Sequence, residues 1–288
     1  MNGTAPAAGA APSGLSAAFL RACRAELTAL KPGNVHIHAG GHGMEVRQFE
    51  LAAEAAAPFI GDAVLRVGAR IRAAVEASMA AAGCNTNLGI ILLCAPLAAA
   101  ALRHEPSSLR DRVKTVLEEL DDNDASDVYA AIRAANPGGL GKSDTGDVSQ
   151  EPTLPILDAM ALAAPRDRIA ANYAFGLRDI FDDHLPLLLR LRARQSGHAP
   201  GNPDEIVSSL YMSILARFPD SHIQRKFGME TAAHVQRLAR AARHDWEPFV
   251  TPKSYTSLLR LDAMLKQEGW NPGTSADFVV ATLFAADL

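Results

Sequence analysis

The sequence has few cysteines and no excess of basic charge. Its three cysteines, Cys23, Cys84 and Cys94, are odd in number and lack metal-type spacing, so they indicate neither a disulfide framework nor a zinc site. A reducing cytoplasm is the simplest location for such a chain. Lysine and arginine total 28 and aspartate and glutamate total 32, which gives a formal net charge of −4. We expect no nucleic-acid partner, because the chain offers no broad positive field and no interleaving of basic with aromatic residues.

Long hydrophobic runs and alternating strand patterns are also scarce. The stretch from Leu88 to Leu102 is uncharged and apolar, but it is shorter than the roughly 20 residues that a membrane-spanning helix needs. We interpret it as a buried central helix and expect no membrane partner. Residues 1–12 lack the basic and apolar regions of a signal peptide and predict a flexible tail. The one short strand candidate, residues 35–38, is closely bounded by glycine and proline, so a loop is an equally good interpretation.

Helical periodicity, in contrast, is abundant. A stripe of apolar residues at helical spacing runs from Leu15 to Leu30, behind a plausible N-cap at Ser13. Further helical runs cover residues 46–57, 60–82, 88–103, 107–120, 126–135 and, with breaks, 153–288. At 48% hydrophobic residues the chain can fill a substantial core. We predict an all-α fold, a single compact domain of about ten to twelve helices over residues 13–288. The apolar helices also leave room for a homodimer.

Four polar segments punctuated by glycine interrupt this helical background. The first is Lys31–His36, which follows Glu26 and also contains Asn34. Its glycine lets backbone amides approach an anion, while Lys31 supplies a compact positive charge. The structural alternative is a helix C-cap followed by a Pro-Gly turn.

The second segment, Gly83–Gly89, immediately precedes the apolar helix. Free amides and the helix dipole at this point could hold a phosphate, and Asn85 and Asn87 could bind ribose hydroxyls. A simple N-cap at Thr86 or Asn87 explains the segment equally well. Cys84 is more typical of a small buried residue than of a nucleophile, since no base is fixed beside it in the sequence.

The third segment, Asp220–Gly228, places an acid and two cations around one turn and includes His222. Arg225 can bind phosphate oxygens through a planar fork that Lys226 cannot reproduce. A solvated charge cluster that caps the following helix is an equally good interpretation.

The fourth segment, Asn271–Asp277, opens the last helix and includes Ser275. An N-terminal cap explains its composition adequately, with Asp277 complementing the helix dipole. The residues that follow, 278–286, are strongly apolar, however, and predict a buried helix. Asp277 would then lie inside the protein, which favours a functional role.

These four segments, in this order, resemble the triphosphoribosyl-dephospho-CoA synthase family. The shared features are a Lys-Pro-Gly turn, a Gly-x-Asn-Thr motif before an apolar helix, an Asp-containing turn with an Arg, and a terminal Asn-Pro-Gly-x-Ser-Ala-Asp. The similarity spans nearly the whole chain and is most specific at Asn271–Asp277. It implies an all-α transferase that uses ATP with Mg²⁺, takes 3′-dephospho-CoA as acceptor, releases adenine, and serves the acyl carriers of citrate or malonate decarboxylase.

The chain also departs from that family. Where the decarboxylase-linked members read Asn-Thr-His-Lys-Gly, this chain has Asn85–Gly89 with neither the histidine nor the lysine. Asn34 and His36 stand where those members favour an apolar residue and an aspartate. The chain is more similar to a branch found in archaea and in bacteria with methanopterin-dependent one-carbon metabolism. The acceptor could therefore be a pterin or furan precursor, and a non-catalytic nucleotide-binding protein is a further alternative.

The resemblance and the residue chemistry together suggest roles for individual side chains. Loss of adenine from C1′ of a ribose passes through an oxocarbenium-like state, for which Asp277 and Asp220 are the candidate catalytic carboxylates. The candidate substrate-binding residues are Lys31, Asn34, His36, Asn85, Thr86, Asn87, His222, Arg225, Lys226, Asn271 and Ser275. The candidate Mg²⁺ ligands are Asp147, Glu151, Asp179 and Asp183. The last two are four residues apart, which places them on one face of an α-helix. This hypothesis requires the four segments to meet at one pocket.

The histidines do not form a recognisable metal site. His36, His38 and His42 lie close together among glycines, but no carboxylate or cysteine completes a site nearby, so we interpret them as neutral loop residues. Three others are expected on helix surfaces: His184, His234 and His244.

Overall fold

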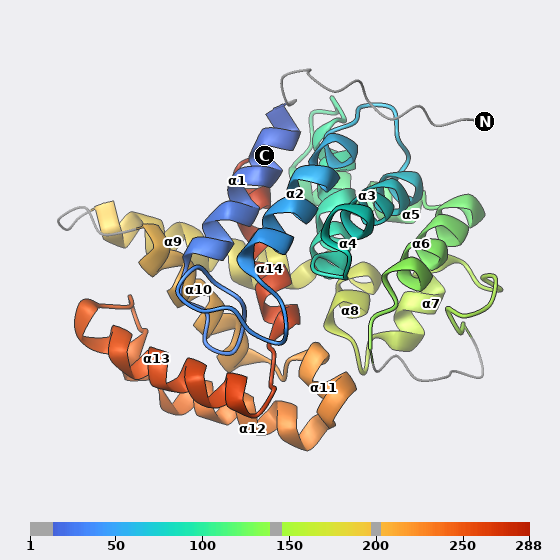
Figure 1. Ribbon diagram of the computed structural model, residues 1–288. Helices are drawn as coiled ribbons and strands as arrows, with labels where there is room; N and C mark the ends of the chain where they lie inside the picture. Colours follow the sequence, from blue (N-terminus) through green and yellow to red (C-terminus); the bar gives the residue numbers. More distant parts are fainter. Residues whose placement is uncertain (1–13, 139–145, 197–202) are drawn as a thin grey trace.

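A computed structural model describes residues 14–138, 146–196 and 203–288 (Figure 1). Within these ranges the chain forms α-helices, one π-helical turn and one short 3₁₀ turn, and no strand, which confirms the predicted all-α fold. Fourteen α-helices are described, slightly more than the ten to twelve expected. The predicted tail and the Ser13 cap lie outside the described residues.

The elements follow one another along the chain with these bounds: α1 (Gly14–Thr28), α2 (Val46–Ile60), α3 (Val67–Ala82), α4 (Leu88–Ala101), α5 (Leu109–Glu118), α6 (Asp122–Ala135), α7 (Ile156–Ala163), α8 (Arg168–Ala174), η1 (Asp179–His184), α9 (Leu185–Ser196), α10 (Pro203–Arg217), α11 (Ser221–Phe227), α12 (Met229–Ala241), η2 (Arg243–Asp245), α13 (Pro252–Gln267) and α14 (Gly273–Ala286).

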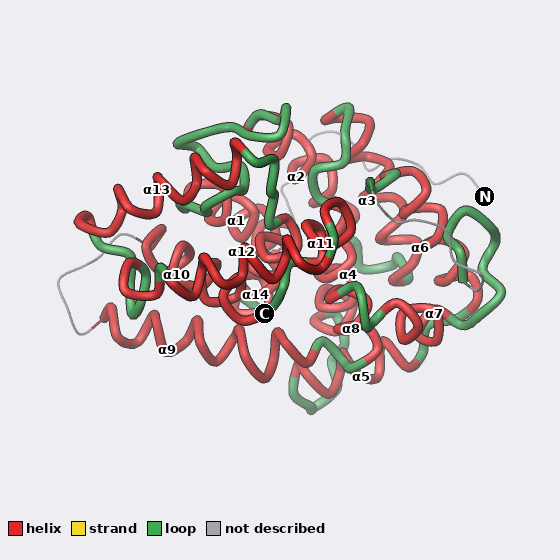
Figure 2. The backbone as a smooth tube through the Cα atoms, turned by 90° about the horizontal axis from the view of Figure 1, so that it is seen from below, coloured by secondary structure: helices red, strands yellow, loops and turns green. Residues whose placement is uncertain are grey.

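Two apolar helices, α4 and α14, form the centre of the domain. Nearly every residue of each is buried, because both sequences are apolar on all sides and neither has a polar face to present to water. α14 packs against α1, α4, α9, α10 and α11. At the α1 contact, the rings of Phe19 and Phe284 meet edge to face with centroids 6.1 Å apart. Both views show α9, α10 and α13 on one side of α14, and α3, α6 and α7 on the other (Figures 1 and 2).

Two helix boundaries differ from the sequence prediction for local reasons. Helix α2 continues past Pro58 to Ile60, so the proline lies within its last turn rather than ending it. The next helix begins at Val67 rather than at position 60. Before it, Asp62 Oδ1 accepts hydrogen bonds from the backbone of Val64 at 2.7 Å and of Leu65 at 3.1 Å, which stabilises a turn.

The segment between α1 and α2 is a loop held against α13. Two isolated bridges, His36 with Ala39 and Gly41 with Met44, replace the strand considered for this region. Gly33 adopts φ of 84° and its amide donates to Asp262 Oδ1 at 2.9 Å. An added Cβ at Gly33 would lie 2.9 Å from the backbone oxygen of Trp270, so the close approach of these segments requires glycine.

His184 lies inside the protein, which corrects the expectation that it lies on a helix surface. Its ring is buried between Phe278 and Phe218, with centroids 5.3 and 6.5 Å away. The residue ends the π-helical turn η1, whose wider winding changes which side chains face the core. His234 and His244 are exposed, as expected.

None of the helices within the described residues combines the length and the apolar character that crossing a membrane would require.

Candidate active site

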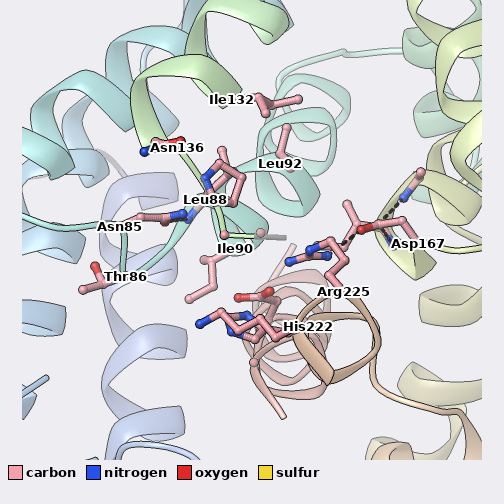
Figure 3. Close-up of a pocket in the computed structure, with 18 of the residues that line it drawn as sticks. Asn85, Thr86, Leu88, Ile90, Leu92, Ile132, Asn136, Asp167, His222 and Arg225 are labelled. Atoms are coloured by element: carbon pink, nitrogen blue, oxygen red, sulfur yellow. Dashed lines mark hydrogen bonds and ion pairs between the residues drawn. The ribbon is translucent and has the colours of Figure 1, made fainter. Parts of the chain in front are cut away.

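The four polar segments meet at one cavity of about 730 Å³. Each segment contributes lining residues: Asn34 from the first, Asn85 and Thr86 from the second, His222, Arg225 and Lys226 from the third, and Asn271 and Asp277 from the fourth. Figure 3 shows Asn85 and Thr86 facing Arg225 and Asp167 across the cavity, with Leu92 and Ile132 above and His222 below. Segments up to about 240 positions apart in the chain thus share one site.

Asp220 joins two of these segments by capping two helices at once. Its Oδ1 accepts hydrogen bonds from the amides of His222 at 2.9 Å and Ile223 at 3.2 Å, at the start of α11. Its Oδ2 accepts from both the amide and the hydroxyl of Ser275 at 2.8 Å, at the start of α14. Burial raises the pKa of Asp220 and these hydrogen bonds oppose the rise. Neither Asp220 nor Ser275 lines the cavity, so both residues serve to hold the starts of α11 and α14 together.

Asp277 differs from Asp220 because its carboxyl group makes no hydrogen bond or ion pair with any residue that the structure describes. It lies in the first turns of α14 against Gly89 of α4, where an added Cβ would come within 2.1 Å of Asp277 Oδ2. Only a glycine leaves room for the carboxyl group there. Burial raises the pKa of Asp277 well above its ordinary value, and the negative charges of Asp220 and Glu26 add to the effect. The protonated form is therefore favoured.

A cationic wall faces this carboxyl group. Arg225 Nη1 donates to Asp167 Oδ2 at 2.7 Å, while Asp167 Oδ1 caps α8. Arg225 Nε is buried without a partner among the residues described. Burial, together with the charges of Arg225, Lys226 and His42, lowers the pKa of His222 to about 3, so the ring is neutral. Such a wall combines positive charge with a neutral hydrogen-bonding ring, as anion binding requires.

Lys31 is placed differently from the expectation that it binds phosphate. Its side chain is fully buried, and its ammonium group contacts Glu26 Oε1 and donates to Asn34 Oδ1 at 2.8 Å and to the carbonyl of Val35 at 2.7 Å. These three acceptors use all three ammonium protons. Lys31 does not line the cavity, whereas Glu26 and Asn34 do. Asn34 Nδ2 in turn donates to Asn271 Oδ1 at 2.8 Å, which joins the first and fourth segments.

Two other predicted substrate-binding residues also make structural contacts instead. His36 is buried against α13, with Nε2 3.3 Å from Asp262 Oδ2, and Asn87 Nδ2 donates to Ser78 Oγ at 3.1 Å. Neither lines the cavity. Asn87 is the N-cap residue of α4, as the sequence allowed, but its side chain makes no cap hydrogen bond; Asn85 Oδ1 instead accepts from the amide of Leu88 at 3.2 Å. The hydroxyl of Thr86 is buried without a partner in the described ranges.

Comparison with known proteins decides the family. Residues 12–288 match the family model CitG, described as ATP:dephospho-CoA triphosphoribosyl transferase. The chain belongs to this family. A crystal structure from Archaeoglobus fulgidus, described as a candidate triphosphoribosyl-dephospho-CoA synthase, superposes with a TM-score of 0.61 at 24% sequence identity, covering 82% of this chain and 96% of that chain. At this identity the similarity supports the fold. A comparison with curated proteins gave no match. The protein is thus an enzyme of the transferase class.

The four carboxylates predicted as Mg²⁺ ligands of this transferase do not come together. Asp147 lines the cavity. Asp179 is buried in a pair with Arg168, with Oδ2 2.6 Å from Nε, and the other two pair at the surface, Asp183 with Arg217 at 2.7 Å and Glu151 with Arg133 at 3.2 Å. Asp179 and Asp183 are four residues apart, but each is taken up by a different arginine and neither lines the cavity. No cluster of three or more potential metal-ligating side chains exists in the part of the chain that the structure describes.

Sequence reasoning missed several residues that line the cavity of this CitG-family chain. The polar ones include Glu26, His42, Gln48, Arg166 and Asp167. The apolar ones include Leu92, Tyr129, Ile132, Ile156 and Met160. One signal could have found Glu26, because it is a charged residue at a buried position of an otherwise apolar helix face. Arg166 and Asp167 follow the short helix α7 and carry no comparable signal.

Proposed function

We propose that this protein transfers the 5-triphosphoribosyl group of ATP to a hydroxyl of 3′-dephospho-CoA or of a related acceptor and releases adenine. The observation that carries the proposal is the carboxyl group of Asp277, which lies without a partner among the described residues in a cavity that all four family-like segments line. The family match supports the reaction class.

Asp277 has the properties of a proton donor for the leaving base. Its raised pKa keeps the proton on the carboxyl group, so that adenine can take it as the bond to C1′ breaks. Arg225 and Lys226 would balance phosphate charge, and Asn34 and Asn271, which also line the cavity, would orient sugar hydroxyls. Asp220 would hold the starts of α11 and α14 in register with these groups.

Mg²⁺ is expected to accompany the triphosphate. Mg²⁺ is commonly bound through one or two carboxylates together with substrate phosphates, so a site without a cluster of protein ligands is compatible with it. Of the predicted ligands, Asp147 lines the cavity and is the candidate carboxylate. The ion would supply charge neutralisation at the phosphate oxygens.

The test is the release of adenine from ATP, followed by chromatography with and without 3′-dephospho-CoA. Asp277→Asn should lower acceptor-dependent release by about 10²- to 10⁴-fold, the range for loss of a general acid. Glu76→Gln, at an exposed pair with Arg72 on α3, is the matched control and should retain activity. Full turnover in Asp277→Asn would remove this residue from the mechanism, and no adenine release by the wild type would refute the proposed function.

The identity of the acceptor is a separate question, and Leu88 bears on it. This residue lines the cavity at the position where decarboxylase-linked members carry a lysine. An apolar side chain there favours, as a second candidate, an acceptor with less negative charge, such as a pterin or furan precursor. A panel of acceptors assayed at equal concentration would separate the candidates, since the true acceptor should give the highest kcat/KM for adenine release.

A further inference from the structure

Glu26 is the second carboxyl group with an unusual environment in this cavity. It lies on α1, only 4% exposed, and lines the cavity. Lys31 contacts its Oε1, while Oε2 makes no hydrogen bond with any residue in the described ranges. Helix α1 packs directly against α14, which carries Asp277 (Figure 1). One oxygen of Glu26 is thus held in place and the other remains available to a molecule in the cavity.

Stability alone does not explain this ion pair. A buried salt bridge contributes little to folding, because removing two charges from water costs about as much as their attraction returns. The Lys31 ammonium is also fixed by Asn34 Oδ1 and the carbonyl of Val35, so three acceptors hold it at one position. That arrangement positions a carboxylate beside the substrate cavity more firmly than a surface pair could.

The two carboxyl groups have opposite surroundings. Burial raises the pKa of Glu26, and the ammonium group at one of its oxygens opposes that rise. Asp277 has no partner of its own and is surrounded by carboxylates, which favours the neutral form. A carboxyl group held by a cation and a second one without such a partner can serve as the base and the acid of one reaction.

We propose that Glu26 is the general base of the reaction and that Lys31 positions it. This inference rests on the proposed function. The acceptor hydroxyl oxygen forms a bond to C1′ of the donor ribose as the bond from C1′ to N9 of adenine breaks. The hydroxyl proton passes to Glu26 Oε2. The electron pair of the broken bond leaves with adenine, which takes the proton of Asp277, so that one proton is gained and one is lost by the protein in each turnover.

The charged groups around Glu26 and Asp277 are consistent with these roles as base and acid. Burial raises the pKa of Glu26 and the adjacent Lys31 ammonium opposes the rise, which suits a base that must both accept and return a proton. Burial lowers the pKa of Lys31, while Glu26 and Asp277 raise it and Lys266 lowers it. Asp277 is further affected by Asp220 and Asp167, which raise its pKa, and by Arg225, which lowers it.

Chemical rescue tests the assignment, because azide is an anionic nucleophile that needs no base. Glu26→Gln and Glu26→Ala should each lower acceptor-dependent adenine release by about 10²- to 10⁴-fold. Azide should restore adenine release in Glu26→Ala, with triphosphoribosyl azide as product detected by mass spectrometry. It should not restore Asp277→Asn, which lacks the acid. Glu54→Gln, a carboxylate paired with Arg24 at the surface, is the matched control and should behave as the wild type.

Removing Glu26 alone leaves the buried Lys31 ammonium without its counter-charge, which can unfold the protein. The double variant Glu26→Gln, Lys31→Met removes both charges and should fold, with the same loss of turnover. Lys31→Met alone should reduce kcat more than KM and shift the acidic limb of the kcat pH profile, which reports the base, to higher pH. Turnover within about threefold of the wild type in the folded double variant, or a Glu26→Ala variant that azide does not rescue, would overturn the assignment.

The proposed function and this inference fail in different ways. If the wild type releases no adenine with any acceptor, the reaction is wrong. If the wild type is active, Asp277→Asn is inactive and the Glu26 variants retain turnover, the reaction stands and the assignment of the base is wrong.

Discussion

Replacing Gly89 with alanine should inactivate the enzyme without unfolding it. Gly89 lies in the first turn of α4, and an added Cβ would come 2.1 Å from Asp277 Oδ2, 2.5 Å from Asp277 Cγ and 2.8 Å from Ile169 Cδ1. Ordinary contacts between carbon atoms lie at about 3.5–4.0 Å. The carboxyl group of Asp277 must therefore move by about 1 Å or more.

The expected magnitudes follow from two opposing effects on stability and one on catalysis. Alanine is favoured over glycine inside a helix by about 0.8–1.0 kcal/mol. Overpacking costs about 1–3 kcal/mol, and here a side chain rather than backbone gives way, so the net loss of unfolding free energy should stay below about 2 kcal/mol. A displacement of about 1 Å in a reacting group can lower the rate by about 10²-fold.

The assay is kcat/KM for adenine release, measured with the unfolding free energy from chemical denaturation. Gly68→Ala is the matched control, since Gly68 also lies in a helix but its added Cβ would meet the backbone of Asp124, 2.5 Å from Cα and 2.7 Å from the carbonyl oxygen. That variant should lose more stability than Gly89→Ala and keep its activity per folded molecule. Unchanged kcat/KM in Gly89→Ala would refute the placement of Asp277 against α4.

Three further outcomes are expected. Above pH 3.8 the unfolded chain loses the Asp277 proton while the folded protein keeps it, so the stability of the wild type falls as the pH rises. The Tm of Asp277→Asn should therefore exceed that of the wild type by more at pH 7 than at pH 3.5. Burial lowers the pKa of His184 from 6.5 to about 4, so the unfolded chain takes up a proton at higher pH than the folded protein does. The free energy of unfolding should therefore fall by about 3 kcal/mol as the pH is lowered from 6.5 to 4, and chemical denaturation of His184→Phe should lack this loss. Arg225→Lys keeps the charge and loses the planar fork, and should raise the KM for ATP about 10- to 100-fold in initial-rate assays.

The fold and the location of the site could be predicted from the sequence because both depend on patterns that span many residues. Helical periodicity is repeated in almost every segment, so single errors do not change the fold class. The apolar run after Asp277 predicted a buried last helix, and α14 is indeed buried almost throughout. The four polar segments were recognisable because glycine and asparagine are uncommon in helices of this kind.

The orientation of individual side chains within those segments could not be predicted. Lys31 and Glu26 are five positions apart across a helix end, and which of them faces the cavity depends on Asn34 and Val35, which the loop brings beneath the ammonium group. The spacing of Asp179 and Asp183 could not reveal that each pairs with a different arginine, Arg168 and Arg217, away from the cavity. In both cases the hydrogen-bond and ion-pair partners decide which way a side chain faces, and the sequence pattern does not reveal those partners.

Two aspartates at helix starts show why hydrogen-bond partners are the better guide to function. Asp220 and Asp277 are indistinguishable by residue type, and both were predicted to be catalytic. Four donors occupy the oxygens of Asp220, so a proton transfer there would break the caps of α11 and α14. Asp277 has no such donors among the described residues, and burial and the charges of Asp220 and Glu26 raise its pKa, although Arg225 lowers it. A half-buried carboxyl group without hydrogen-bond donors, at the wall of the cavity, is therefore the better candidate for proton transfer.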